Sequence, residues 1–163
     1  RYAATKSWFK NTVFVITGDH TSHGVLEYFY CPSGRYEVPF LIYNSGIVPQ
    51  KFNKSLSQCD ILPTLSGVLG NKIHYSGLGR NALDSAYEGY SMHYDKGLYY
   101  MIQYPFAMGM NEFGEVKVFQ KQIRNDPKPT KLEHNGLTYN KMKSTLTAYL
   151  SVFSQRLKSN KWR

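Results

Sequence analysis

Cysteine is scarce in this sequence, since Cys31 and Cys59 are the only two among 163 residues. They form no CxxC pair, and their density is far below that of disulfide-rich secreted domains. The count excludes a disulfide scaffold. It leaves open whether the two residues are free thiols or one bridge, and it does not fix the redox compartment.

Long hydrophobic runs are also missing. No stretch approaches 18 consecutive apolar residues, so we expect no membrane span within this chain. The first residues show no apolar core of a signal peptide. Because the sequence begins at Arg1 and not at Met, we interpret it as a soluble piece of a longer protein. Its composition, 42% hydrophobic and 19% charged, is that of a globular domain.

Negative charge is sparse, with 11 Asp and Glu against 20 Lys and Arg and a formal net charge of +9. The basic residues are scattered, and their densest groups lie at 121–131 and 156–163. Neither group alternates with stacking aromatic residues or matches a nucleic-acid reader motif. The pattern predicts a solvated basic face and no nucleic-acid partner. Attraction to an anionic lipid surface or an anionic substrate stays open.

The stretch "NTVFVITGDHTSHG" at 11–24 contains the first candidate site. Its apolar run at 13–16 is typical of a strand buried on both faces of a parallel sheet. Asp19 and His20 follow directly, and in open α/β sheets reacting groups collect at the carboxyl ends of strands. A carboxylate and an imidazole are ligands of divalent metals. On these residues alone, a helix cap at Asp19 and a solvated His20 remain alternatives.

The rest of the chain divides into two predicted units, 1–85 and 86–163. The first combines strands and a helix, and the second is rich in Tyr, Phe and Met with turn signals between short strands. A helix at 57–70 is predicted from Ser57 as its N-cap and Gly70 just past its end. The other expected elements are the end of a helix at 1–10, strands at 12–18 and 38–44, antiparallel strands at about 90–94, 98–103, 106–110 and 115–119, a linker at 124–130 and an amphipathic helix at 139–158.

Three segments together resemble a known family. The stretches "TGDH", "GRYEVPFLIY" and "SQCDILPTLSGVLG", in this order and at these intervals, resemble the C-terminal part of a sulfatase-type domain of the alkaline phosphatase superfamily. "GDHTS" followed by "GRYEVP", with "GLGRNAL" further on, is most similar to lipoteichoic acid synthase-like phosphoglycerol transferases of the bacterial cell envelope. The resemblance covers residues 1 to about 85, and beyond them only the layout is similar.

The resemblance implies an α/β fold. The expected architecture is the C-terminal portion of an alkaline phosphatase-like sandwich, in which helices flank a buried, mostly parallel sheet. A small antiparallel sheet and a terminal helix are expected to follow.

The resemblance also implies roles for four residues. Asp19 and His20 are expected to be ligands of one divalent metal ion, which is Mn, Zn, Mg or Ca. His23 is expected to contact substrate, because relatives carry a substrate-contacting His a few residues past the Asp-His pair, with a surface histidine as the alternative. Arg35 is a candidate for binding a substrate anion, with a structural salt bridge as the alternative. Asp60, near the start of its helix, is interpreted as structural.

Several parts of the family's active site do not appear in this sequence. The nucleophile, a Thr, Ser or modified Cys at an upstream helix start, is not found, and neither is the upstream acidic metal ligand. The loop Gly77-Leu78-Gly79-Arg80 contains no His for a second metal, which favours a one-metal site. The chain is therefore expected to hold half an active site, to be inactive alone, and to have the upstream part of its own polypeptide as a partner.

The leading hypothesis for the parent protein is a metal-dependent phosphoglycerol transferase that acts on an anionic phospholipid or on a sulfated or phosphorylated glycan. Such parents are membrane-anchored, with the catalytic domain outside the cytoplasm, in the periplasm or at the cell surface. A sulfatase that hydrolyses sulfate esters is the alternative, and an upstream Cys-x-Pro-x-Arg segment would identify it. A second alternative is a non-catalytic binding domain in which Asp19 and His20 hold no metal.

Overall fold

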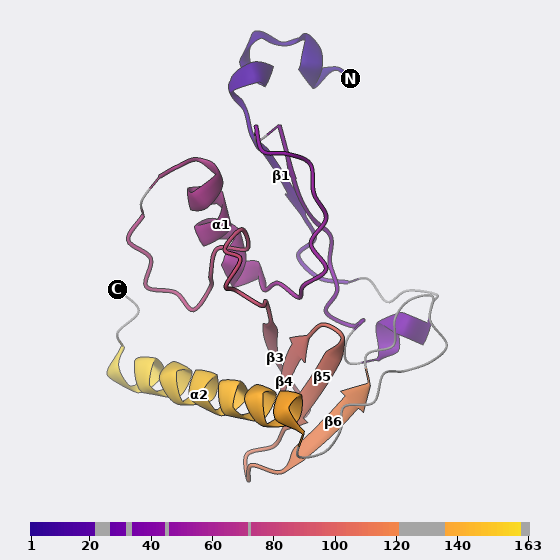
Figure 1. The fold of residues 1–163 in the computed structure, drawn as a ribbon, viewed down its shortest axis with the longest axis vertical. Helices are drawn as coiled ribbons and strands as arrows, with labels where there is room; N and C mark the ends of the chain where they lie inside the picture. Colours follow the sequence, from indigo (N-terminus) through magenta and orange to yellow (C-terminus); the bar gives the residue numbers. More distant parts are fainter. Residues whose placement is uncertain (22–26, 32–33, 45, 72, 121–135, 161–163) are drawn as a thin grey trace.

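The structure is a computed structural model that describes residues 1–21, 27–31, 34–44, 46–71, 73–120 and 136–160. It contains a two-stranded ribbon, β1 and β2, and a four-stranded sheet, β3 to β6 (Figure 1). Helix α1 lies beside the ribbon, and helix α2 lies across the larger sheet. Within these described ranges, no helix has the length and apolar character needed to cross a bilayer.

The N-terminal part differs from the prediction in two ways. Residues 1–10, expected to end a longer helix, form two short 3₁₀ helices, η1 (Ala3–Thr5) and η2 (Ser7–Asn11). Strands β1 (Phe14–Thr17) and β2 (Phe40–Tyr43) lie within the predicted ranges 12–18 and 38–44, but they pair antiparallel. A short 3₁₀ helix, η3 (Glu27–Tyr30), lies between them.

The expectation that these strands are buried on both faces in a mostly parallel sheet is therefore wrong for β1 and β2. Val15, Ile16 and Leu41 are 37%, 53% and 53% exposed. An unbroken apolar run indicates strands that need cover on both faces. Among the described residues, the remaining elements leave much of these two strands uncovered.

Helix α1 (Ile61–Val68) follows a turn of 3₁₀ helix, η4 (Gln58–Asp60). Ser57 is the N-cap, as predicted: its Oγ accepts from the Cys59 N–H at 3.4 Å, and its own N–H donates to Asp60 Oδ2 at 2.8 Å. This reciprocal capping box satisfies backbone donors that the first turn leaves without partners. Gly70 follows the C-cap Leu69, and its φ of +67° suits the left-handed position after a C-cap.

The larger sheet is an antiparallel meander in the order β3-β4-β5-β6. Its strands are β3 (Ser91–Asp95), β4 (Leu98–Gln103), β5 (Phe106–Met110) and β6 (Val116–Gln120), so all four predicted strands are confirmed within one residue at each end. Lys96 and Gly97 both have positive φ, 49° and 78°, between β3 and β4. Two such residues form the tight hairpin turn whose twist matches that of its strands.

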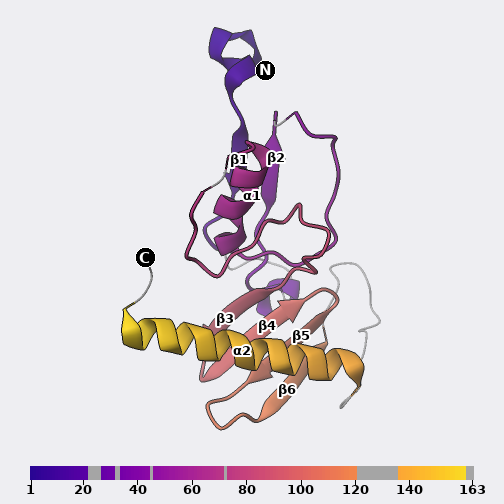
Figure 2. The same cartoon turned by 60° about the vertical axis from the view of Figure 1, so that its left-hand side comes forward.

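Helix α2 (Leu137–Ser159) covers one face of this sheet (Figure 2). Met142 and Leu146 are fully buried at the interface. All five methionines of the chain contribute to this core or pack against it. The amphipathic helix predicted at 139–158 is confirmed, and so is the α/β class with a small antiparallel sheet and a terminal helix.

Contacts from the loop before β2 join the N-terminal part to β3. The Tyr36 ring stacks on the His93 ring with centroids 3.9 Å apart and planes 8° from parallel. Arg35 forms an ion pair with Asp95 next to this stack. The boundary predicted at 85/86 is not tested by these contacts and stays a prediction.

Candidate functional site

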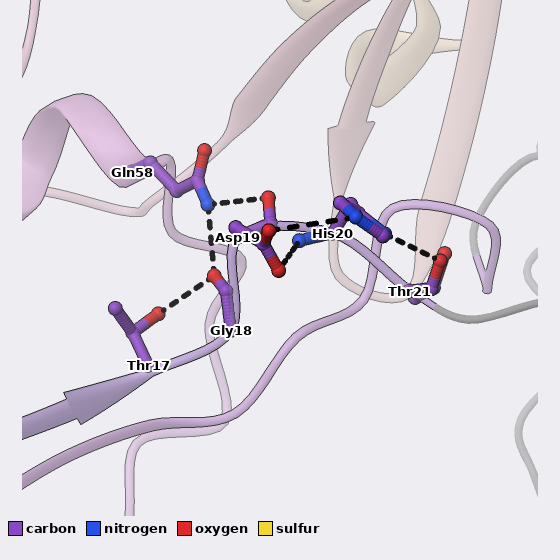
Figure 3. A network of polar contacts seen from close by, with 6 residues as sticks. All are labelled: Thr17, Gly18, Asp19, His20, Thr21 and Gln58. Atoms are coloured by element: carbon purple, nitrogen blue, oxygen red, sulfur yellow. Dashed lines mark hydrogen bonds and ion pairs between the residues drawn. The ribbon is translucent and has the colours of Figure 1, made fainter.

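Asp19 and His20 lie on the turn that follows β1 (Figure 3). Their side chains are 87% and 78% exposed, so nothing in the described structure covers them. The Asp19 Oδ2 and His20 Nε2 atoms are 3.4 Å apart, and the His20 N–H donates to Asp19 Oδ1 at 2.8 Å. A carboxylate oxygen and an imidazole nitrogen thus converge at the end of the strand.

Local contacts lower the pKa of Asp19 and orient the ring of His20. The His20 N–H, the N–H of Asp19 itself and the nearby His20 ring hold the pKa of Asp19 below its ordinary value, which keeps a carboxylate at neutral pH. The His20 Nδ1 lies 3.0 Å from the Thr21 carbonyl oxygen. Because a carbonyl can only accept, this contact requires a proton on Nδ1, so the neutral form of the ring has its lone pair on Nε2, where a ligand can bind.

The donor pair fits one divalent ion. In a tetrahedral site with ligand bonds of about 2.0–2.2 Å, neighbouring donor atoms lie about 3.4 Å apart, which matches the separation of Oδ2 and Nε2. In the part of the chain that the structure describes, no cluster of three or more His, Cys, Asp and Glu side chains could hold a metal. A complete site would therefore need further ligands besides Asp19 and His20.

Gln58 holds this turn from the other side. Its Nε2 donates to the carbonyl oxygens of Gly18 and Asp19, both at 2.9 Å. The sequence prediction missed this residue, because no local motif links positions about 40 residues apart. The one available signal was its position: Gln58 directly follows the predicted N-cap Ser57 and is therefore the first residue of the helix.

Arg35 comes close to this turn through its backbone. The Thr21 hydroxyl donates to the Arg35 carbonyl oxygen, and Asp19, His20 and Arg35 line the same open groove of about 1370 Å³. The Arg35 guanidinium pairs with Asp95, the structural salt bridge that the sequence left as the alternative. Its role in substrate binding stays a prediction. His23 and the predicted linker at 124–130 lie outside the described residues.

Asp60 is structural, as interpreted from the sequence. It is 2% exposed, and its carboxylate accepts from Ser57 N–H, from Arg80 N–H at 2.7 Å and from the Tyr87 hydroxyl at 3.0 Å. Burial, together with the charge of Asp60, raises the pKa of Tyr87. The two cysteines form no disulfide, and Cys59 is exposed.

Comparison with known proteins gives a partial match. Residues 2–71 match the family model described as Sulfatase. A crystal structure of a protein in the alkaline phosphatase superfamily from Vibrio parahaemolyticus aligns with a TM-score of 0.70 and 18% identity, covering 98% of this chain and 38% of that one. No curated protein matches the chain. At this identity the structural likeness establishes a shared fold, and the chain spans well under half of that protein's length.

Proposed function

We propose that residues 1–163 contribute the Asp19–His20 part of a metal site to an enzyme acting on phosphate or sulfate esters, and that this enzyme is a phosphoglycerol transferase of the lipoteichoic acid synthase type. The observation that carries the proposal is the convergence of Asp19 Oδ2 and His20 Nε2, 3.4 Å apart, at the end of β1. Both residues lie within the segment that matches the sulfatase family model.

A divalent ion bound there would neutralise negative charge on a phosphoryl or sulfuryl oxygen. The residues of this chain would bind the ion and orient the substrate. Asp19 supplies a carboxylate held ionised by its backbone hydrogen bonds. His20 supplies Nε2, with its ring orientation set by the Nδ1 contact to Thr21. The Arg35 guanidinium has five N–H donors, more than its pairing with Asp95 uses, so it has donors for an anionic substrate group. His23 is proposed as a second substrate contact.

The nucleophile would come from a part of the polypeptide outside residues 1–163. The apolar side chains exposed on β1 and β2 support this, because contiguous exposed apolar surface marks a site of contact. The greater length of the similar Vibrio parahaemolyticus protein also supports it. In this proposal the parent is membrane-anchored and works outside the cytoplasm, and the net charge of +9 suits work beside anionic lipid.

A sulfatase is the second candidate, favoured by the description of the family model that matches residues 2–71. The Asp19–His20 pair serves either reaction equally, since both develop charge on non-bridging oxygens. The identity of the nucleophile and the substrate assay separate the two.

The test uses the complete polypeptide that contains residues 1–163. Asp19→Ala combined with His20→Ala is compared with Glu112→Ala combined with His74→Ala, which removes the same two chemical groups from exposed positions away from the groove. Bound metal is measured by elemental analysis. Turnover is measured as release of diacylglycerol from phosphatidylglycerol and as release of sulfate from an aryl sulfate.

The proposal expects loss of metal and of lipid turnover in the first variant only. Sulfate release without lipid turnover would overturn the transferase proposal in favour of the sulfatase. Unchanged metal content and activity after loss of Asp19 and His20 would overturn both enzymes in favour of a non-catalytic domain.

A further inference from the structure

We propose that Gln58 is a positioning residue, which holds the turn carrying Asp19 and His20 in the geometry that binds the metal ion. This inference rests on the proposed function above. It assigns a role to a side chain that would not itself touch the metal or the substrate.

The contacts of Gln58 define its orientation. Both partners of its amide group, the carbonyls of Gly18 and Asp19, are acceptors, so the nitrogen and not the oxygen must face them. Each of the two N–H bonds of the amide then has its own acceptor at 2.9 Å. The side chain thus spans the peptide unit that leads into the metal ligand Asp19 and the unit that leads out of it (Figure 3).

The turn needs such support because it has little of its own. Gly18, Asp19 and His20 follow the last residue of β1, and the two ligand side chains are largely exposed. Apart from Gln58, the bonds that the described structure gives to Asp19 and His20 come from each other and from Thr21. These contacts hold the residues relative to one another. The Thr21 hydroxyl bonds the far end of the turn to the Arg35 carbonyl oxygen in the loop before β2, but none of these bonds joins Gly18 or Asp19 to the start of η4.

Gln58 makes that attachment, because it begins η4 directly after the N-cap Ser57. In the capping box, the N–H of Ser57 donates to Asp60, which is 2% exposed and also accepts from Arg80 and Tyr87. A buried, fully bonded carboxylate therefore fixes the backbone at Gln58. The two hydrogen bonds of its amide group connect this fixed backbone to the turn that carries Asp19 and His20.

The test measures Mn²⁺ affinity of the complete polypeptide by titration calorimetry. In Gln58→Met the side chain keeps its length and neutrality but loses both donors. The matched control is Gln103→Met, because Gln103 donates through Nε2 to Glu88 at 3.0 Å in a place remote from β1. Gln58→Asn, which keeps the amide but is one methylene shorter, is the second variant. The imidazole ¹⁵N shifts of His20 in the metal-free protein provide a readout independent of metal loading.

We expect Gln58→Met to bind Mn²⁺ about 10-fold more weakly, the lower end of the effect of outer-shell partners on metal sites. Gln58→Asn should also be weakened, the His20 shifts should change in both, and Gln103→Met should match the wild type. If the wild type binds Mn²⁺ and both Gln58 variants bind it equally well, this inference is overturned while the proposed function stands. Equal weakening in Gln103→Met would assign the effect to global stability and would overturn it too. If the wild type binds neither Mn²⁺ nor Zn²⁺, Mg²⁺ or Ca²⁺ in the same titration, the proposed function fails and this inference fails with it.

Discussion

His93 should make the stability of the protein depend on pH between about 6.5 and 4. Burial lowers the pKa of His93 from 6.5 to about 4. Its ring is stacked under Tyr36, and its Nε2 lies 3.0 Å from Ser91 Oγ. The folded state therefore favours the neutral ring, whereas the unfolded chain protonates His93 as soon as the pH falls through 6.5.

The linkage between proton binding and folding gives the direction and size of this change in the free energy of unfolding. The contribution of a neutral His93 to stability is complete above pH 6.5 and is lost progressively as the pH falls toward the folded-state pKa. A pKa lowered from 6.5 to about 4 corresponds to about 3 kcal/mol. Because the ring is only partly buried, solvent screening reduces the expected loss to about 1–2 kcal/mol.

The assay is urea unfolding of wild type and His93→Phe at pH 7.5, 6.0, 5.0 and 4.5. Phenylalanine keeps an aromatic ring against Tyr36 but cannot titrate. Asp95 and Arg35 beside the stack are present in both proteins, so their contributions cancel in the difference. The wild type should lose about 1–2 kcal/mol more than the variant between pH 7.5 and 4.5. Equal losses in the two proteins would refute the assignment of this pH dependence to His93.

Two further substitutions test the core and the helix cap. Leu146→Ala should lower the free energy of unfolding by about 2–5 kcal/mol, because this side chain of α2 is fully buried against the sheet. The control Leu157→Ala, at a position 56% exposed on the same helix, should cost under about 1 kcal/mol; similar costs by urea unfolding would mean that α2 does not pack as described. Asp60→Asn leaves one acceptor oxygen for the three donors of Ser57, Arg80 and Tyr87, so it should cost about 2–3 kcal/mol. An unchanged melting temperature would contradict the role of Asp60 as the anchor of the helix start.

The parts of the fold that the sequence predicted well are those with local causes. Strands β3 to β6 are joined by short turns, and residues such as Gly97 mark where the chain reverses. Helix α2 carries apolar residues at spacings of three and four, which identify its buried face within the helix itself. The capping of η4 by Ser57 is equally local, since donor and acceptor lie within three residues.

The parts that the sequence missed depend on distant partners. The unbroken apolar run of β1 predicted burial, but the strand's neighbours in space decide that, and Ile16 is 53% exposed here. Asp19 and His20 were found because they are adjacent in the sequence. Gln58 was not found because its acceptors lie 39 and 40 residues away. The Arg35 ion pair with Asp95 spans 60 residues, so the sequence alone left its two possible roles undecided.

Methionine side chains fill the interface between α2 and the sheet, so their oxidation reports how often this interface opens. Thioether sulfur is readily oxidised to the sulfoxide once an oxidant reaches it. Met101, Met108 and Met142 are 1%, 0% and 0% exposed, so peroxide reaches them only when the helix separates from the strands. A sulfoxide is polar and chiral and would not fit back into the same space. Each opening in the presence of an oxidant can therefore add one oxygen atom, about 16 mass units, to a methionine. These additions accumulate over the lifetime of the molecule.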